Sequence, residues 1–348
     1  MISEVTIDLI LGRLLILAPV ALVALFLSLE LIILLRPWLQ RYALARPNAR
    51  SSHQQPTPQG GGIAVVVVTL AVAWAAVALL PGFLQDQGGL FLAASAAAAL
   101  LALVGAIDDI RSLPAAPRLA LQCLAAGALV AAFPAEWRIL PLVPWWLERL
   151  SLFIGCVWLV NLVNFMDGID WMTVVEVVPL TGAIVLFGLL GVVAILPALV
   201  AAALFGALLG FAPFNKPVAK LFLGDVGSLP IGLLLGWLLL DLAGRGHPAA
   251  AIILPLYYVA DATVTLIGRI ARREPFWQAH RTHFYQRAVD KGFTVPAIVA
   301  RVLLVNLALV VLALTTVAAR SIIVSLVSLA AAAAVVGWLL WSFARGKQ

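Results

Sequence analysis

Polar side chains recur at every third position in one short stretch between two apolar runs. They are Asn161, Asn164, Asp167 and Asp170. Residues three apart are neighbours on a helix, so the two amides are expected to share one face. Gly168 then allows the chain to turn, and both carboxylates are expected where a membrane span meets water. A helix end that merely reaches the lipid headgroups would explain one or two such groups, so four in register favour a binding or catalytic site.

Two other acidic motifs lie at the ends of apolar runs. Asp108 and Asp109 are adjacent, and two carboxylates so close repel each other unless a positive group lies nearby. An acidic surface pair beside Arg111 is the alternative interpretation. Asp225 has a glycine on either side, within Gly224–Ser228. Small residues and free N–H groups at a helix start suit a phosphate or a metal-bound phosphate, whereas a simple N-cap would explain the aspartate but not the glycines.

Basic residues gather in two further polar segments. The candidate phosphate ligands in segment 272–287 are His280, Arg281, His283 and Arg287. Arginine suits this task because it combines charge with a forked geometry that fits phosphate. A basic amphipathic segment lying on anionic lipid is the alternative. The earlier segment, 46–62, contains prolines and glycines that predict a shaped loop, although an ordinary basic cytoplasmic loop would have a similar composition.

The elements that must position these residues follow from the composition. Of 348 residues, 64% are hydrophobic and 11% are charged, and the mean hydropathy of +1.10 predicts a membrane protein. The net charge of +6 does not indicate a nucleic-acid partner, because the arginines and lysines lie at span ends. Cys123 and Cys156 lie inside apolar runs and predict neither a disulfide framework nor a zinc site. No basic residue precedes Arg13, so the first span is expected to stay in the mature protein.

Apolar runs long enough to cross a bilayer predict one all-α domain over residues 1–348, an integral membrane bundle of about eleven transmembrane helices. The runs are 12–35, 60–82, 89–107, 117–134, 149–166, 174–190, 192–212, 227–243, 249–268, 297–319 and 321–343. The pair 174–190 and 192–212 has almost no connector. Most of the 22 basic residues fall between alternate runs, which predicts an external N-terminus and a cytoplasmic C-terminus. On the opposite side, segment 136–149 contains tryptophans typical of a segment lying in the interface.

The acidic motifs and the last basic segment all fall on the predicted cytoplasmic side. Five carboxylates from three connections are expected there, and a hard divalent cation is their natural partner. They are Asp108, Asp109, Asp167, Asp170 and Asp225. Mg²⁺ prefers oxygen ligands and usually keeps waters and substrate phosphates in its shell. With a basic clamp beside it, such a cation would serve phosphoryl chemistry. The sequence contains no P-loop and no dinucleotide-binding fingerprint.

In their types and order, the motifs resemble those of the polyprenyl-phosphate N-acetylhexosamine-1-phosphate transferases. This superfamily also contains phospho-MurNAc-pentapeptide translocase. The resemblance covers most of residues 36–292. The matching motifs are KPNxRxxH…PxPxxGG at 46–62, DD at 108–109, NxxNxxDGxD at 161–170, GDxGS at 224–228, and an acidic residue before the last basic loop, Asp261.

The resemblance implies a reaction and a role for each motif. A polyprenyl phosphate would attack the β-phosphorus of a UDP-N-acetylhexosamine and give polyprenyl-diphospho-sugar and UMP. Asp225 would bind Mg²⁺, for which Mn²⁺ could substitute, and Asp167 is the second metal ligand implied. Asp108 and Asp109 would position or deprotonate the carrier phosphate; since a phosphate is already ionised near pH 7, positioning and charge neutralisation could suffice. The substrate-binding residues implied are Asn48, Arg50, His53, Asn161, Asn164, Asp167, Asp170, His280, Arg281, His283 and Arg287.

One departure from the family pattern limits which sugar donor the resemblance implies. Many members have HxHH after the arginine of the last loop, whereas this sequence has HFYQ at 283–286. Tyrosine and glutamine can hydrogen-bond but carry no positive charge. The HRxHxYQR form resembles the branch that initiates O-antigen chains, which disfavours a MurNAc-pentapeptide donor. The resemblance therefore implies an enzyme of the bacterial inner membrane with a cytoplasmic active site, and a homodimer is compatible with the sequence.

Other classes of membrane protein remain as alternatives. A secondary transporter would have carboxylates along an ion pathway, but most acidic residues here cluster at cytosolic ends, and only Glu30 and Asp241 lie deeper. An intramembrane aspartyl protease would need a second aspartate in an adjacent span, preferably in a Tyr-Asp pair, and the sequence contains no Tyr-Asp pair. A purely structural subunit would not need the five acidic residues.

Overall fold

The structure is a computed structural model that describes residues 4–45, 56–80, 82, 84, 87–275 and 280–346. The regular secondary structure of this part of the chain is helical except for one short sheet, in which β1 (Leu44–Ala45) pairs antiparallel with β2 (Thr57–Pro58). The helices are α1 (Glu4–Tyr42), α2 (Gly62–Leu79), α3 (Gly88–Ile110), α4 (Ala115–Ala132), α5 (Trp145–Met166), α6 (Met172–Leu189), α7 (Ile195–Asn215), α8 (Asp225–Gly244), α9 (Pro248–Ile253), α10 (Leu256–Ala271), α11 (Phe284–Asp290), α12 (Val295–Ala319) and α13 (Ile322–Arg345).

Ten of the described helices are long and apolar enough to cross a membrane, which confirms the predicted polytopic all-α fold. Each predicted span corresponds in order to one of them except the ninth, 249–268, which consists of two shorter helices, α9 and α10. These two helices meet at Pro255, which has no N–H group with which to continue the helical ladder. The predicted division between 174–190 and 192–212 is confirmed, because α6 ends at Leu189 and α7 begins at Ile195.

Helix α8 is the centre of the bundle, because its two faces belong to different parts of the core. Leu229, Leu233 and Trp237 on one face pack into a hydrophobic cluster with side chains of α3, α4 and α5. Leu235 and Leu242 on the other face join the cluster formed with α1, α6, α7, α12 and α13. A helix that is apolar all round is expected to be buried in this way. The N-terminus of α8 is therefore a fixed point on which other elements can converge.

Small residues allow close contact between the long helices. A Cβ atom at Gly206 of α7 would collide with the backbone oxygen of Ala21, and one at Gly210 would collide with that of Leu25. Helix α1 can therefore lie directly against α7 along much of its length. Van der Waals packing of this kind drives helix association in membranes, where lipid removes the hydrophobic advantage of burial.

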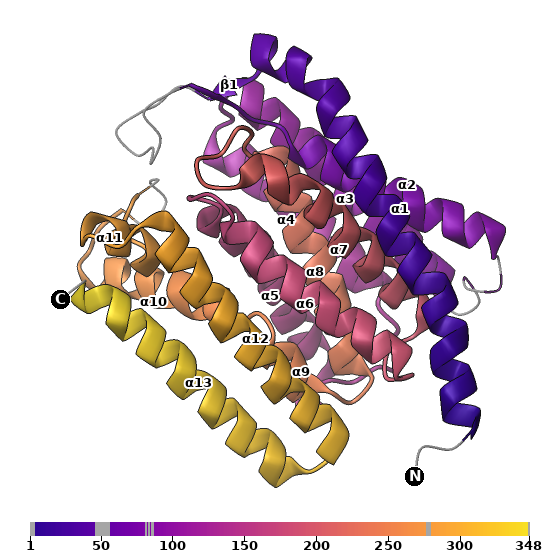
Figure 1. The fold of residues 1–348 in the computed structure, drawn as a ribbon. Coiled ribbons are helices and arrows are strands. Elements are labelled where there is room, and N and C mark those ends of the chain that lie inside the picture. The colour runs from indigo at the N-terminus through magenta and orange to yellow at the C-terminus, as the bar shows by residue number, and fades with distance from the viewer. Residues whose placement is uncertain are drawn as a thin grey trace.

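The bundle presents apolar side chains outward and separates the two chain ends. Leu15, Leu34 and Ile322 are large hydrophobic residues that are 76%, 73% and 73% exposed, as expected of surfaces that face lipid. Helix α1 lies along one side of the bundle, and the α12–α13 hairpin lies along the opposite side (Figure 1). The described chain begins at one end of the bundle and finishes near the other (Figure 1). This arrangement is compatible with termini on opposite sides of a membrane.

The orientation predicted from the basic residues can be tested with introduced cysteines. Val218, between α7 and α8, is 79% exposed, and Leu142, between α4 and α5, is 99% exposed. In a Cys123→Ser background, a membrane-impermeant maleimide should label Leu142→Cys in intact cells but label Val218→Cys only after the membrane is opened. Labelling of Val218→Cys from outside intact cells would reverse the predicted topology. Cys156 is buried and should stay unlabelled in both variants.

Candidate active site

Two loops that are far apart in sequence pair with each other at the start of α8. The backbone N–H of Phe222 donates to the carbonyl of Pro58 over 2.9 Å, and the N–H of Gly61 donates to the carbonyl of Phe222 over 2.9 Å. The N–H of Gly62 continues this pairing to the carbonyl of Leu223 at 2.8 Å. The end of the first loop is therefore attached to the segment that precedes Asp225. Three predicted substrate ligands of that loop lie outside the described residues: Asn48, Arg50 and His53.

The glycines of these motifs are required by close backbone contacts. A Cβ atom at Gly62 would collide with the backbone of Gly227, and one at Gly105 would collide with the backbone of Asp225. Gly224 has φ +78°, a conformation that residues with a side chain rarely adopt. Helices α2, α3 and α8 thus meet at distances that only glycine allows. This explains why Asp225 has a glycine on either side.

Asp109 caps the N-terminus of α8. Its two carboxylate oxygens accept hydrogen bonds from the N–H groups of Asp225, at 3.0 Å, and Val226, at 3.1 Å. A carboxylate at this position also complements the positive end of the helix dipole. The expectation that free N–H groups at this helix start would bind phosphate is therefore wrong for these two groups. The structure gives Asp109 a positioning contact, and a catalytic role for it stays a prediction.

Asp108 and Asp225 converge on a single arginine. The Nη1 atom of Arg118 lies 2.6 Å from Oδ2 of Asp108 and 3.5 Å from Oδ2 of Asp225. The other oxygen of Asp108 accepts a hydrogen bond from the N–H of Leu113 at 2.5 Å. Adjacent acids were expected to need a positive neighbour, and that neighbour is Arg118 rather than the exposed Arg111. One guanidinium neutralises only one of the two carboxylates, so the group formed by Asp108, Asp225 and Arg118 has a net negative charge when both acids are ionised.

The predicted amide face of α5 lies against the same group. Asn164 Nδ2 donates to Asp225 Oδ1 over 2.7 Å and to Ser228 Oγ over 3.0 Å. One turn earlier, Asn161 Nδ2 donates to Gln122 Oε1 over 2.8 Å. The expectation that both amides share a face is confirmed. Asn164 therefore joins the NxxNxxDGxD motif to the GDxGS motif.

The two carboxylates that follow α5 are held by neighbouring protein groups. Asp167 Oδ1 accepts a hydrogen bond from Thr173 Oγ1 at 2.5 Å, and burial together with the charges of Asp109 and Asp170 raises the pKa of Asp167 to about 7. Asp170 is buried and accepts a hydrogen bond from the N–H of Ala219 at 3.0 Å, which fastens the segment before α8. Substrate contacts of Asp167 and Asp170 stay predictions, since neither lines the cavity described below.

Buried Asp261 of α10 organises the last basic segment. Its carboxylate accepts hydrogen bonds from the N–H groups of Phe284, at 3.0 Å, and Tyr285, at 3.2 Å. The same carboxylate lies 3.3 Å from Nδ1 of His283. The hydroxyl of Tyr285 donates to the carbonyl of Phe165 over 3.1 Å, which ties α11 to the end of α5. Asp261 therefore fixes where His283 points.

The basic segment carries less charge toward the cavity than its composition predicts. Burial, together with the nearby His283 and Arg269, lowers the pKa of His280 to about 4, so this ring is neutral at pH 7. Arg281 lies 3.5 Å from Asp290, and Arg287 is exposed with its guanidinium over the ring of Phe284. Phosphate contacts of these two arginines stay predictions. The cationic clamp expected from composition is thus only partly formed in the described chain.

A cavity of about 670 Å³ brings five of the predicted site residues together. They are Asn161, Asn164, Asp225, His280 and His283. Arg118 and Gln122 of α4 line it as well, although the sequence pattern did not identify them as site residues. Their spacing of four in an otherwise apolar run places both on one helix face, which is the signal that could have found them. The remaining wall is largely apolar and comes from α4, α5 and α10.

Two carboxylates of this site fit a hard cation. Among the described residues, no group of three or more acidic, histidine or cysteine side chains is placed to hold a metal. Mg²⁺ needs fewer, because one or two carboxylates plus substrate phosphates are its usual ligands. Asp225 and Asp108 meet that requirement, since both reach the same nitrogen of Arg118. No described hydrogen bond or ion pair joins Asp167 to Asp225, so Asp167 as second ligand stays a prediction.

The chain is similar to known transferases. The sequence profile of glycosyl transferase family 4 matches residues 91–243. A decaprenyl-phosphate N-acetylglucosaminephosphotransferase of Mycolicibacterium smegmatis is 36% identical over 216 residues, which cover 56% of this chain and 52% of that relative. The enzyme of the same name from Mycobacterium leprae is 30% identical over 287 residues, 72% of this chain and 71% of that relative.

A more distant relative matches over a longer region. The probable undecaprenyl-phosphate N-acetylglucosaminyl 1-phosphate transferase of Bacillus subtilis is 23% identical over 305 residues, 78% of each chain. The match to the Mycolicibacterium smegmatis protein spans only about half of that relative's length. The expected superfamily resemblance is nevertheless confirmed, and the chain belongs to glycosyl transferase family 4.

Proposed function

We propose that the protein transfers N-acetylhexosamine 1-phosphate from a UDP-sugar to a polyprenyl phosphate, giving polyprenyl-diphospho-sugar and UMP. The observation that carries this proposal is the cavity of about 670 Å³, which joins an apolar wall to Arg118, Asp225 and the two histidines. A lipid with a phosphate head has the same division into apolar and charged parts. The proposal places the reaction at the cytoplasmic face of a bacterial inner membrane, where the basic segments are predicted to lie.

The apolar wall suits the hydrocarbon part of the carrier. Phe153, Val157 and Trp158 of α5 line the cavity on one side, and Leu119 and Leu266 line it from α4 and α10. Trp158 also borders a second, almost wholly apolar hollow of about 350 Å³ between α5, α8 and α9–α10. An isoprenoid chain that leaves the site beside α5 would contact only such side chains.

The polar end suits the phosphate and the donor diphosphate. Arg118 can hold a phosphate with its forked guanidinium, and Asn164 keeps Asp225 turned toward the cavity. Asp225 and Asp108 would hold Mg²⁺, which when bound would neutralise charge on the diphosphate. An oxygen of the carrier phosphate would attack the β-phosphorus of the donor, and the bond to the α-phosphate of UMP would break. The neutral ring of His280 and the positioned ring of His283 can hydrogen-bond donor oxygens.

The donor proposed first is UDP-N-acetylglucosamine. N-Acetylglucosamine is the sugar named for the three relatives, and the O-antigen-initiating branch resembled here acts on related amino sugars. Tyr285 and Gln286 stand where many family members have histidine, and both side chains are buried. Gln286 Oε1 accepts a hydrogen bond from the N–H of His283 at 3.3 Å. These residues therefore build the site rather than contact a large peptide-bearing donor.

A transfer assay with metal control tests the proposed function. Purified protein, undecaprenyl phosphate and radiolabelled UDP-sugars should give a lipid-linked sugar with Mg²⁺ or Mn²⁺ and none in EDTA, because the diphosphate charge is then not neutralised. The panel should include UDP-N-acetylglucosamine, UDP-N-acetylgalactosamine and UDP-MurNAc-pentapeptide. Full turnover in chelator would exclude the metal role, and no transfer from any UDP-sugar would exclude the activity.

Asp225→Asn should remove activity while keeping the fold. The amide oxygen can still accept the hydrogen bond of Asn164, but the negative charge that would hold Mg²⁺ is lost. Turnover should fall on the order of a thousandfold, with little change in melting temperature. Glu136→Gln, at an exposed position near the other end of the bundle, is the matched control and should keep normal turnover. Near-normal turnover of Asp225→Asn would exclude a role for the negative charge and leave Asp225 only its hydrogen bond from Asn164, which asparagine can also accept.

Asp261→Asn tests whether this residue positions the donor-binding histidine. Its amide would present N–H groups to backbone donors of α11, so one accepting oxygen is lost and the melting temperature should fall. If His283 binds the donor, KM for the UDP-sugar should also rise severalfold more than kcat falls. Thr265→Val removes only a 3.4 Å hydrogen bond to the same carboxylate, so it should lower stability slightly and leave KM unchanged. A normal KM for Asp261→Asn would contradict the positioning role.

A further inference from the structure

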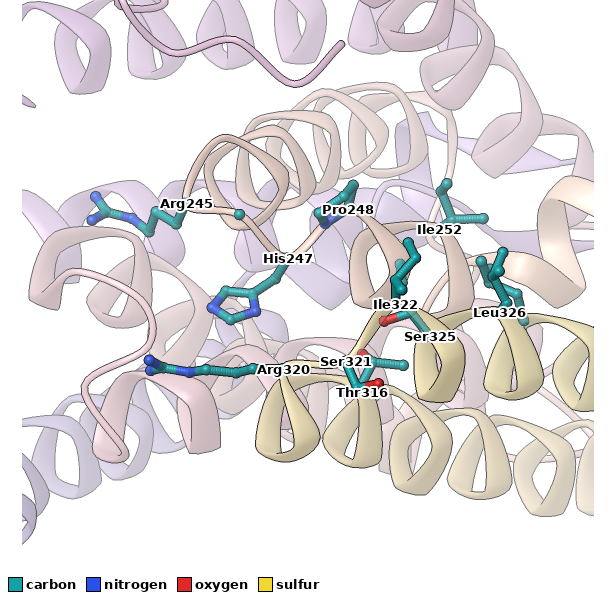
Figure 2. A pocket seen from close by; sticks show the side chains of 13 residues that line it. Arg245, His247, Pro248, Ile252, Thr316, Arg320, Ser321, Ile322, Ser325 and Leu326 are labelled. Carbon is teal, nitrogen blue, oxygen red and sulfur yellow. The ribbon is translucent and has the colours of Figure 1, made fainter. Parts of the chain in front are cut away.

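A second cavity, of about 570 Å³, lies at the end of α8 opposite Asp225, and Figure 2 shows the side chains that line it. It is formed where α8 ends, α9 begins and the chain turns between α12 and α13. Helix α8 starts at Asp225 and has 20 residues, so it separates the two cavities by about 30 Å. None of the predicted site residues lines this second cavity.

Nitrogen-bearing side chains gather at one end of this cavity. Arg245, His247 and Arg320 lie together in the view of Figure 2, away from Ile252 and Leu326. The charge of Arg245 is already neutralised, because its guanidinium forms an ion pair with Asp241 at 2.7 Å. The guanidinium also lies over the ring of Trp137. Arg320 has no acidic partner among the described residues. Its charge adds to burial in lowering the pKa of His247, so positive potential is left uncompensated there.

The opposite end of the cavity is apolar and open. Ile252, Ile322 and Leu326 are 54%, 73% and 59% exposed. Hydroxyl groups of Thr316, Ser321 and Ser325 also line the cavity. Because these helices cross the membrane, the exposed aliphatic side chains lie where acyl chains would contact them.

The backbone at Arg320 is unusual. This residue follows α12 with φ +47°, in the left-handed region where glycine is least strained. The turn between α12 and α13 therefore does not require an arginine, and glycine, which has no Cβ atom, would fit its geometry better. The strain is understandable if the side chain has a ligand.

We propose that this cavity binds the phosphate headgroup of an anionic glycerophospholipid from the leaflet at that end of the bundle. Arg320 and His247 would contact the phosphate, and Ile252, Ile322 and Leu326 would contact an acyl chain. Charge complementarity selects an anionic headgroup, and the exposed aliphatic wall selects a lipid over a free anion. The site is separate from the transferase cavity and does not depend on the proposed reaction.

Thermal stability in detergent provides the test. The melting temperature of the full chain is measured with added dioleoylphosphatidylglycerol, dioleoylphosphatidylcholine or inorganic phosphate. The phosphatidylglycerol arm should raise the melting temperature in a saturable way, with little response in the other two arms. An equal response to phosphatidylcholine would overturn the choice of an anionic headgroup, and an equal response to inorganic phosphate would show a free-anion site instead.

Two variants separate loss of the site from loss of the fold. Arg320→Gly removes the charge but suits the left-handed backbone, so its lipid-free melting temperature should be equal or higher while its apparent affinity for phosphatidylglycerol falls at least tenfold. His247→Gln should weaken the same response severalfold. Arg301→Gln changes an exposed arginine near the other end of α12 and should keep the full response. An unchanged phosphatidylglycerol response in Arg320→Gly would overturn the proposal.

Discussion

The site is held in place by the carboxylate of Asp109, which accepts hydrogen bonds from the N–H groups of Asp225 and Val226. This contact fixes the end of α3 against the start of α8, where Gly105 allows the two backbones to touch. Without the carboxylate, two enclosed donors would lose their partner, and each such loss typically disfavours the fold by about 1–3 kcal/mol. This arrangement fixes the backbone of Asp225. Its side chain is then oriented by Asn164, whose Nδ2 donates to Oδ1 of Asp225. The position of the carboxylates at the polar end of the cavity therefore depends on packing between α3, α5 and α8.

The acidic residues of the motifs differ in the groups that they contact. Asp109 and Asp261 cap helices, and Asp170 fastens a loop through the N–H of Ala219. Asp108 and Asp225 differ, because they share a single arginine at the wall of a cavity. What sets Asp108 and Asp225 apart is their shared contact with Arg118, a side chain that lines the cavity.

Much of the fold could be predicted from the sequence, because a bilayer leaves few ways to satisfy a backbone. Hydropathy located every long helix of the described residues. It missed the break at Pro255, because no charged residue interrupts the apolar run there. The motif spacing predicted that Asn161 and Asn164 lie on one helix face, and both line the same cavity. It did not identify Arg118, because an arginine near a span end is also what membrane orientation requires. Asp170 and Asp225 look alike in sequence, and only tertiary contacts show that one is buried against a loop.

The break between α9 and α10 has a consequence for how a lipid substrate would be recognised. Pro255 and Val259 border the apolar hollow beside α5, and Leu266 of α10 borders the main cavity, so both spaces lie among helices that face the bilayer. A long-chain molecule that reaches them sideways keeps its tail in hydrocarbon throughout. The transfer free energy of about 0.8 kcal/mol per methylene is then the same before and after binding and contributes no selectivity. Recognition is left to the headgroup, and occupancy follows the mole fraction of the lipid within the membrane rather than its concentration in water.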